Sequence, residues 1–382
     1  MTGFSDGDRV RRIAEAAQSD RRWLNASAVG SRLAATLASP IHRESLRHTP
    51  FDALLRVFEE IEPEAAIDAA INGLEQPGVS ALALSAVDTA ALPMEFVTDL
   101  PEPARHAASD LALLAARDGQ LITVSASPPA PIRIEDMGKG AGLTVLRVQP
   151  NVTLELVERV APTGPRAGLF IVDLGAGATL NHYRAVSPGA TTLWLGACVH
   201  VAAGACYRAN FVARGRARAR LETHVVLAEA HARAELTGAS VVSDGEHIDQ
   251  PVILEHRAAD TTSTQRFHGI GVGKGRSSFN GRIHIHAGAT RSDAWLSNRN
   301  LAMHPDAEIN TKPELEIYTD DVRCAHGATV GQLDADALFL MQARGIPDAA
   351  ARQLLAHAFL RACIAEPLAH THAQELLGAL PG

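Results

Sequence analysis

The chain has little cysteine, few aromatic residues and no long apolar run. Four cysteines occur among 382 residues, and aromatic residues make up 4% of the sequence. The opening MTGFSDGDRVRR lacks the apolar stretch of a secretory signal, so a disulfide framework is not expected. The absence of about eighteen consecutive apolar residues argues against a transmembrane helix. Together these absences predict a cytoplasmic chain without membrane attachment.

Basic residues are also too few for a nucleic-acid binder that relies on phosphate neutralisation. The chain has 35 Lys and Arg against 43 Asp and Glu, which gives a net charge of −8. Hydrophobic residues make up 46% and charged residues 20%, proportions typical of a globular protein. A chain of this length is expected to form two or three domains.

The first part of the chain shows the periodicity of helices. Apolar residues recur at three- and four-residue spacings in RVRRIAEAAQSDRRWLNASAVGSRLAATLA and TPFDALLRVFEEI. Pro50 after Thr49 is typical of a helix start. A further helix is expected in PARHAASDLALLAARDG, ending at Gly119. We therefore predict an N-terminal helical domain over residues 1–120.

From Leu121 to about Val330 the pattern changes to short runs of alternating apolar and polar residues, which predict strands. Corners of small residues recur at intervals of 27 to 29 residues, and they end at Thr179, Cys206, Arg233, Thr261 and Thr290. A constant interval in strand-forming sequence indicates coils that stack on one another. We predict a parallel β-helix over residues 121–331. An antiparallel sandwich is the alternative, but it would not need similar corners at one interval.

The helical period returns after Gly331. The segment DADALFLMQARG has Asp334 as a cap and Gly345 as a stop. A second helix is expected to begin with Pro347 at its first position, and a short last helix after Pro367. The expected apolar face of the second helix comprises Leu354, Leu355, Ala358, Phe359 and Ala362. We predict a C-terminal helical domain over residues 332–382.

Three motifs are weak signals for function. GIGVGKGRSSFNG is not a phosphate-binding loop, because Gly275 follows Lys274 and strand sequence follows; we expect a turn. His284 and His286 on one strand face could bind a metal, but hydrogen-bonded or exposed side chains are the favoured interpretation. Cys198, Cys206 and Cys363 lie in apolar surroundings and are expected to be buried.

The segment EIYTDDVRCAHGATVG places Cys324 one residue from His326. If residues 314–326 form one strand, alternation puts both side chains on one face, together with Glu314 and Glu316. Their Cα atoms would then lie about 7 Å apart, close enough for one metal centre. Iron–sulfur and soft-metal sites generally need about four protein ligands. The residues alone therefore leave two interpretations open, a partial metal site and a buried cysteine beside a solvated histidine.

A longer signature surrounds this motif. It resembles the SufD branch of the SufB/SufD family of iron–sulfur cluster assembly proteins. The matching residues are Thr311-Lys312-Pro313, Leu315 to Tyr318, Asp320-Asp321-Val322, the Cys-x-His-Gly-Ala-Thr-Val-Gly run from Cys324 and Arg344-Gly345-Ile346. Upstream, the matches are Phe279, Asn280, Gly281, Asn298, Asn300, Leu301 and Met303.

The resemblance implies a right-handed parallel β-helix between two helical domains, in a scaffold subunit that is not itself an enzyme. It implies pairing with a SufB-type subunit and binding of a SufC-type ABC ATPase, which would hydrolyse the ATP. A transient iron–sulfur cluster would form at the subunit interface, with His326 as ligand and Cys324 beside it. The ATPase is expected on the C-terminal helices, with Gln342, Arg344, Gly345 and Ile346 as candidate contacts.

Other functions remain to be distinguished from this one. A SufB-like or homodimeric paralogue is the nearest alternative. A β-helix enzyme would need an exposed, carboxylate-rich cleft. If the last strands supply half of a shared site, their edge must pair with another chain. We therefore expect a dimer through the strands near 314–330, native as a heterodimer, with a homodimer possible for the isolated chain.

Overall fold

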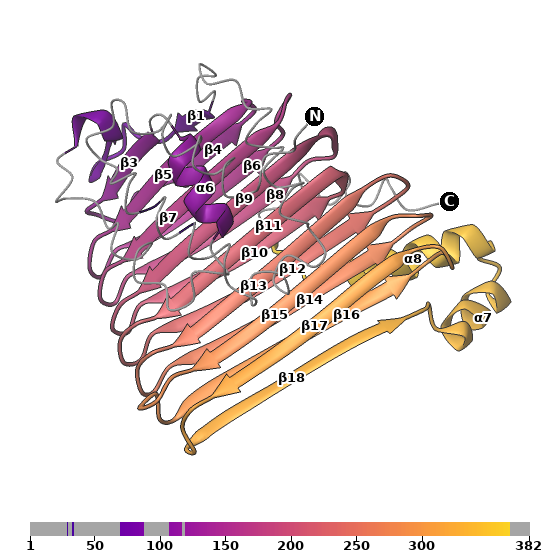
Figure 1. Cartoon of the computed structure of the whole chain (residues 1–382). Helices are drawn as coiled ribbons and strands as arrows, with labels where there is room; N and C mark the ends of the chain where they lie inside the picture. Colours follow the sequence, from indigo (N-terminus) through magenta and orange to yellow (C-terminus); the bar gives the residue numbers. More distant parts are fainter. Residues whose placement is uncertain (1–28, 30–32, 34–68, 88–106, 117–118, 367–382) are drawn as a thin grey trace, which may run out of the picture.

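The computed structural model describes residues 29, 33, 69–87, 107–116 and 119–366. The strands in these ranges form two facing sheets of nine strands each (Figure 1). The first sheet has the strand order β1 (Ala69–Asn72), β4 (Ile132–Asp136), β6 (Thr153–Val160), β8 (Thr179–Val186), β10 (Cys206–Arg214), β12 (Arg233–Val242), β14 (Thr262–Gly271), β16 (Ser292–Ala302) and β18 (Val322–Gly331). The second has the order β17 (Glu308–Ile317), β15 (Arg276–Ile285), β13 (His247–His256), β11 (Arg216–Leu227), β9 (Gly189–Val201), β7 (Arg166–Leu174), β5 (Gly140–Val148), β3 (Gly119–Val124) and β2 (Val79–Ala83).

Successive strands alternate between the two sheets, so that the chain winds as a coil. All ladders from β3 and β4 onward are parallel, whereas β1 and β2 pair antiparallel with β4 and β3. This is the predicted parallel β-helix. No helix in the described part of the chain has the length and apolar character needed to cross a membrane.

The repeat interval read from the sequence corresponds to one coil. Thr179, Cys206 and Arg233 are direct ladder partners, as the first corners predict. The next coil is longer, and Arg233 pairs with Thr262, which in turn pairs with Asp293. The predicted corners at Thr261 and Thr290 are therefore displaced by one and three residues. The sequence showed the repeat and its slight lengthening, but it underestimated the length of the later coils.

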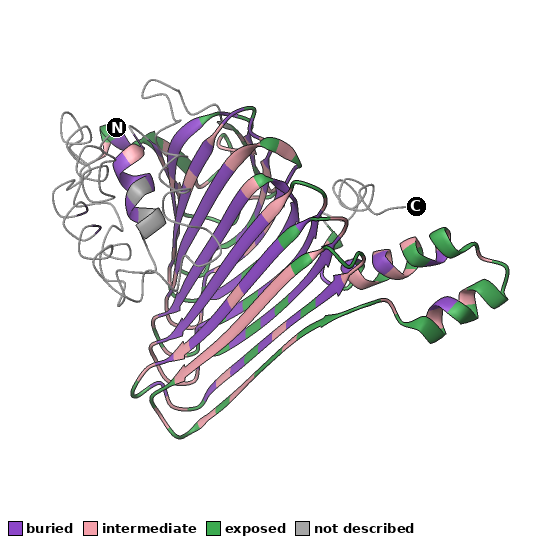
Figure 2. Ribbon diagram, turned by 45° about the vertical axis from the view of Figure 1, so that its right-hand side comes forward, coloured by how far each residue is buried: buried purple, intermediate pink, exposed green. Residues whose placement is uncertain are grey.

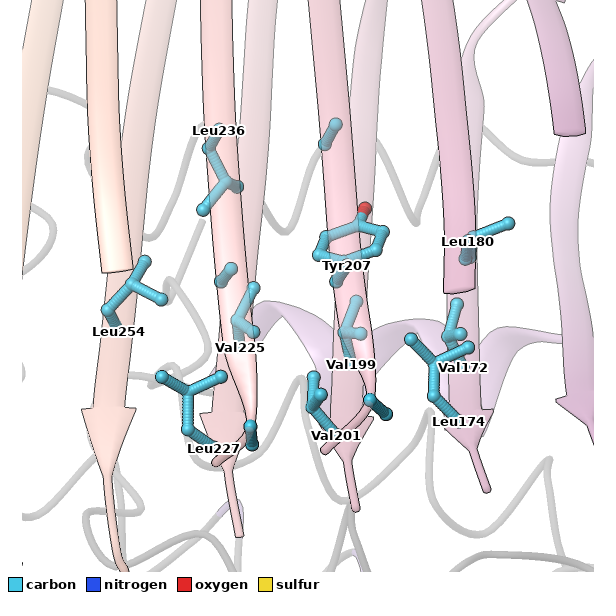
Figure 3. Packing of buried hydrophobic residues seen from close by; sticks show 14 of the residues in the cluster. Val172, Leu174, Leu180, Val199, Val201, Tyr207, Val225, Leu227, Leu236 and Leu254 are labelled. Atoms are coloured by element: carbon cyan, nitrogen blue, oxygen red, sulfur yellow. The ribbon is translucent and has the colours of Figure 1, made fainter. Parts of the chain in front are cut away.

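The core consists of columns of apolar side chains that run from coil to coil between the sheets (Figure 3). In one column Val172, Val199, Val225 and Leu254 are successive ladder partners, and all are buried. Burying a side chain of this size stabilises the fold by about 1.5–3 kcal/mol. Because each coil covers the apolar face of the one before, the columns hold the coils in register.

Two predictions for the N-terminal region are corrected. Residues 69–72 and 79–83 form strands β1 and β2, although the helical period was expected to continue to residue 120. Helix α6 spans Ala107–Ala115 and lies against β5 and β7, and Gly119 begins strand β3 instead of ending the helix. A short 3-10 helix, η1, spans Leu84–Ala86. The predicted helix start at Thr49–Pro50 lies outside the described residues.

Both predicted helices after the β-helix are present. Helix α7 (Ala335–Ala343) begins after Asp334, whose carboxylate accepts hydrogen bonds from the backbone N–H groups of Asp336 and Ala337. It stops at Gly345, which has a φ of 85°. Helix α8 spans Asp348–Arg361, with Pro347 as its N-cap and not its first residue. The predicted last helix lies outside the described residues.

The apolar face predicted for α8 is wrong in part. Leu354, Ala358 and Ala362 are exposed, whereas Ala356 and Leu360 are buried against the outer face of the first sheet. The helix takes this rotation because polar groups of the sheet bind the residues that directly follow its C-terminal end. The amide nitrogen of Asn210 donates to the Cys363 carbonyl at 2.7 Å, and its oxygen accepts from the Ala365 N–H at 3.0 Å. The His268 ring also stacks on Phe359.

One column of the core contains a neutral histidine. His256 follows Leu227 in the ladder, is fully buried, and bonds through its ring nitrogens to the hydroxyls of Thr261 and Ser263. Burial, followed by the nearby His286, lowers the pKa of His256 from 6.5 to about 4. The unfolded chain therefore binds a proton between these two values that the folded chain does not.

We expect the free energy of unfolding to be highest above pH 6.5 and to fall by about 3 kcal/mol as pH decreases toward 4, from this group alone. Urea unfolding at several pH values measures the slope. In His256→Gln, which does not titrate, the slope should be smaller although the stability at neutral pH is lower. An unchanged slope in this variant would show that His256 is not the titrating group.

Candidate functional site: the open end of the β-helix

The β-helix ends in two strands that each lack a neighbour on one side. Among the described residues, β17 pairs only with β15, and β18 only with β16. In Figure 2 the residues of this end are half-buried or exposed (pink and green), whereas those of the preceding coils are mostly buried (purple). Pro313 lies in β17, where an edge position tolerates a residue without an N–H. The last coil is therefore an open edge in both sheets.

The strand predicted over residues 314–326 is wrong. The chain turns after Ile317, and β18 starts at Val322 in the other sheet. Val322 and Cys324 pack against the apolar core, as does Leu315 of β17. Since side chains alternate along a strand, Glu314 and Glu316 point outward and do not share a face with Cys324.

Cys324 and His326 do share a face, and it is the inner one. They are the ladder partners of Ala294 and Leu296, which are buried interior residues of β16. His326 thus continues an interior column into the last coil. It is exposed because no further coil covers it, whereas Cys324 is half-buried. The interior of the β-helix therefore ends in an imidazole and a thiol, which both belong to the strand at the open end.

The surroundings of the thiol keep it protonated. Burial, with a smaller contribution from the carboxylate of Asp293, raises the pKa of Cys324 from 9.0 to about 11. Asp293 is the ladder partner of Arg323, and its carboxylate lies 3.5 Å from that guanidinium. Asp293 was not predicted as part of the site, because it precedes the motif by one full coil. The repeat interval was the sequence signal that could have placed Asp293 on the coil next to Cys324.

We expect Cys324 of the isolated chain to react with iodoacetamide about 100-fold more slowly than an unperturbed cysteine at neutral pH. The reason is that only the thiolate reacts, and a pKa raised by about two units lowers its fraction by that factor. Mass spectrometry of the alkylated peptide over time measures the rate. Asp293→Asn should increase the rate modestly, since it removes the negative charge. A rate equal to that of free cysteine would contradict the assigned environment.

The other sequence candidates do not join this site. The rings of His284 and His286 stack with centroids 3.9 Å apart, and His286 bonds Glu255 at 3.0 Å, which fits the interpretation as hydrogen-bonded side chains. No group of three or more potential ligands that could hold a metal occurs in the described part of the chain. Cys198, Cys206 and Cys363 are buried, as expected, and none of the three is in a disulfide. Lys274 lies in the turn between β14 and β15, as expected.

The candidate partner-binding residues form the turn between α7 and α8. Gln342, Arg344 and Gly345 are exposed, and Ile346 is half-buried. The Gln342 side chain donates to the Asp348 carboxylate at 2.7 Å. Gln342 therefore also stabilises the turn, so its substitution would change both the fold and the surface. Substitution of Arg344 tests a surface contact more directly.

Comparison with known proteins agrees with this architecture and motif. Residues 136–359 match the family model described as SUF system FeS cluster assembly, SufBD core domain. This match covers more than half of the chain. The chain belongs to the SufBD family. The matched region contains most of the β-helix, both site residues and helix α7.

Curated members of the SufBD family match shorter segments. The chain is 43% identical over 114 residues to the iron–sulfur cluster assembly protein SufD of Escherichia coli, which is 30% of this chain and 27% of the relative. It is 47% identical over 81 residues to a SufBD family protein of Synechocystis, covering 21% and 18%. A SufBD family protein of Mycobacterium bovis is 33% identical over 141 residues, covering 35% and 36%. The chain thus aligns with about a third or less of the length of these relatives.

Proposed function

We propose that this SufBD family member is a SufD-type scaffold subunit for iron–sulfur cluster assembly in the cytoplasm. In this role it performs no catalysis itself. It pairs with a SufB-type subunit through the open end of its β-helix, and a SufC-type ATPase binds to its C-terminal helices. The observation that supports the proposal most directly is the placement of His326 and Cys324, both on the inner face of a terminal strand that has a neighbour on one side only.

The chemistry of this end suits a shared site. An exposed imidazole is a ready ligand for iron, and the thiol needs only a nearby metal to lose its proton. Two side chains are too few to hold a cluster alone, so the remaining ligands must come from the partner that covers the edge. Iron and sulfide are then cargo of the assembled complex, and the cluster is transient.

Co-expression with a SufB-type subunit and a SufC-type ATPase tests the proposal. A tagged copy of this chain, purified anaerobically, should retain both partners and carry iron and acid-labile sulfide in comparable amounts. Isolated, the chain should form at most a homodimer and carry neither. Recovery of the chain without either partner from such cells would contradict the proposal.

The helical hairpin of α7 and α8 offers a surface for the ATPase. Phe339, Leu340 and Leu354 are large apolar residues that are exposed, Phe339 to 72%. Because Phe339 is exposed, a polar substitution there is not expected to impair folding. Phe359 stacks on His268 and remains an unsuitable probe.

We expect Phe339→Ser and Arg344→Glu to abolish ATPase binding without loss of helix content, because both change only solvent-facing groups. Pull-down of the ATPase and circular dichroism measure the two properties. Leu82→Ser, an exposed apolar position on β2 at the other end of the molecule, is the matched control. Full ATPase binding by both hairpin variants would place the contact elsewhere.

A further inference from the structure

A cavity of about 30 Å³ lies between the two sheets in the first coils of the β-helix. Its volume is sufficient for about two water molecules. One wall comes from β4, β6 and β8, and the other from β5, β7 and β9. The residues that line it include the charged side chains Asp136, Glu158, Arg166 and Arg184 and the glycines Gly142, Gly168 and Gly196.

The first of two arginines at the cavity is fully paired. The Nε of Arg166 donates to both carboxylate oxygens of Asp136, at 3.0 and 3.1 Å, and Nη1 donates to the carbonyls of Gly140 and Ala167. Its Nη2 lies 3.0 Å from Asp136. Gly142 permits this arrangement, since a Cβ there would come within 2.6 Å of the guanidinium.

The second arginine at the cavity is only partly paired. Arg184 is 4% exposed, its Nε donates to Glu158 Oε2 at 2.6 Å, and its guanidinium lies over the Phe211 ring. The Arg184 side chain lines the cavity. Its two terminal nitrogens have no hydrogen-bond partner within the described ranges. Glu158 Oε2 also binds the ring of His182, while Oε1 has no partner in the same part of the chain. The site thus retains unused donors and one unused acceptor.

We propose that this cavity binds a small monovalent oxyanion that carries a hydroxyl group, of the bicarbonate type. Two of its oxygens accept hydrogen bonds from the planar fork of Arg184, and its hydroxyl donates to Glu158. A buried guanidinium with unused N–H groups is costly, and it binds two-oxygen anions bidentately. Because the charges of the two arginine–carboxylate pairs cancel, a monovalent anion adds only one net charge to the interior.

The shape of the site supports this class of ligand. Bicarbonate is compact, and its oxygens lie closer together than those of two hydrogen-bonded waters, so it fits a space of about two waters. Gly168 contributes to the space because it has no side chain. A Cβ at this position would meet only the end of Leu195, at 3.0 Å.

Thermal unfolding of the full chain with sodium bicarbonate tests the proposal, against sodium chloride at equal ionic strength. Bound ligand stabilises the folded state by mass action, so we expect a rise in the unfolding midpoint that saturates with bicarbonate concentration. Gly168→Ala, whose methyl group fills the cavity, should lose the rise. Gly327→Ala, where a Cβ meets nothing within 4 Å, is the matched control and should keep it.

A second variant keeps the test decisive if Gly168→Ala folds poorly. Arg184→Lys preserves the charge but not the two-pronged donor, and it should also lose the bicarbonate effect. Nitrate, which has no hydroxyl to offer Glu158, should stabilise the wild-type chain less than bicarbonate. An equal shift in bicarbonate and chloride, an undiminished shift in both variants, or a crystal structure in bicarbonate with only water at Arg184 would each overturn the proposal.

Discussion

Cells that carry His326→Ala are expected to mature iron–sulfur enzymes no better than cells that lack this chain. The substitution removes the exposed imidazole from the inner face of the last coil, where the proposed cluster forms. The stability of the subunit should change by no more than about 0.5 kcal/mol, because the side chain is exposed and supports no packing. Activity of a cluster-dependent enzyme in a complemented deletion strain measures the effect, and urea unfolding measures the stability.

Two variants of the same strand separate ligation from structure. Thr329→Ala changes an exposed side chain of β18 and should leave assembly intact. Cys324→Ala should reduce assembly less than His326→Ala does, since the thiol of the isolated chain is protonated. If Cys324→Ala cells fail while His326→Ala cells are normal, the roles of the two residues are reversed. If neither substitution matters, the cluster forms elsewhere.

The second large effect concerns association. Lysine at both Ile317 and Val330 should weaken binding to the SufB-type partner, and any homodimer, by about 3 kcal/mol or more, which is about 100-fold or more in Kd. Both side chains are apolar and continue the inner rows of β17 and β18, yet they are 41% and 48% exposed. A partner that covers the open end would bury two charges without counter-ions. Analytical ultracentrifugation of the wild-type and variant subunits measures the change.

Leu82→Lys provides the control for this experiment. It places the same charge on a residue that is 55% exposed on β2, the edge strand at the opposite end of the second sheet. The variant should associate normally. Equal association by the double variant would show that the open edge of β17 and β18 is not the interface, and loss of association in Leu82→Lys would place the interface at the other end.

The strand region was predictable because each coil repeats a local pattern. Strand alternation and corners such as those at Cys206 and Arg233 recur at an interval equal to one turn of the coil. Helix α7 was predictable for a similar local reason, since Asp334 caps it and Gly345 stops it. The strands β1 and β2 were not, because their pairing with β4 and β3 is antiparallel and lies outside the repeat.

The repeat, the β-rich class and the adjacency of Cys324 and His326 could be predicted from the chain alone, because they depend on residues close together in it. The tertiary structure decided what that adjacency means. Only the register between coils shows that both side chains point inward, that the acids of β17 point away and that Asp293 is on the adjacent coil, near enough for its charge to affect the thiol. Their position at an open end depends on where the stack of coils stops, and that is a property of the whole fold.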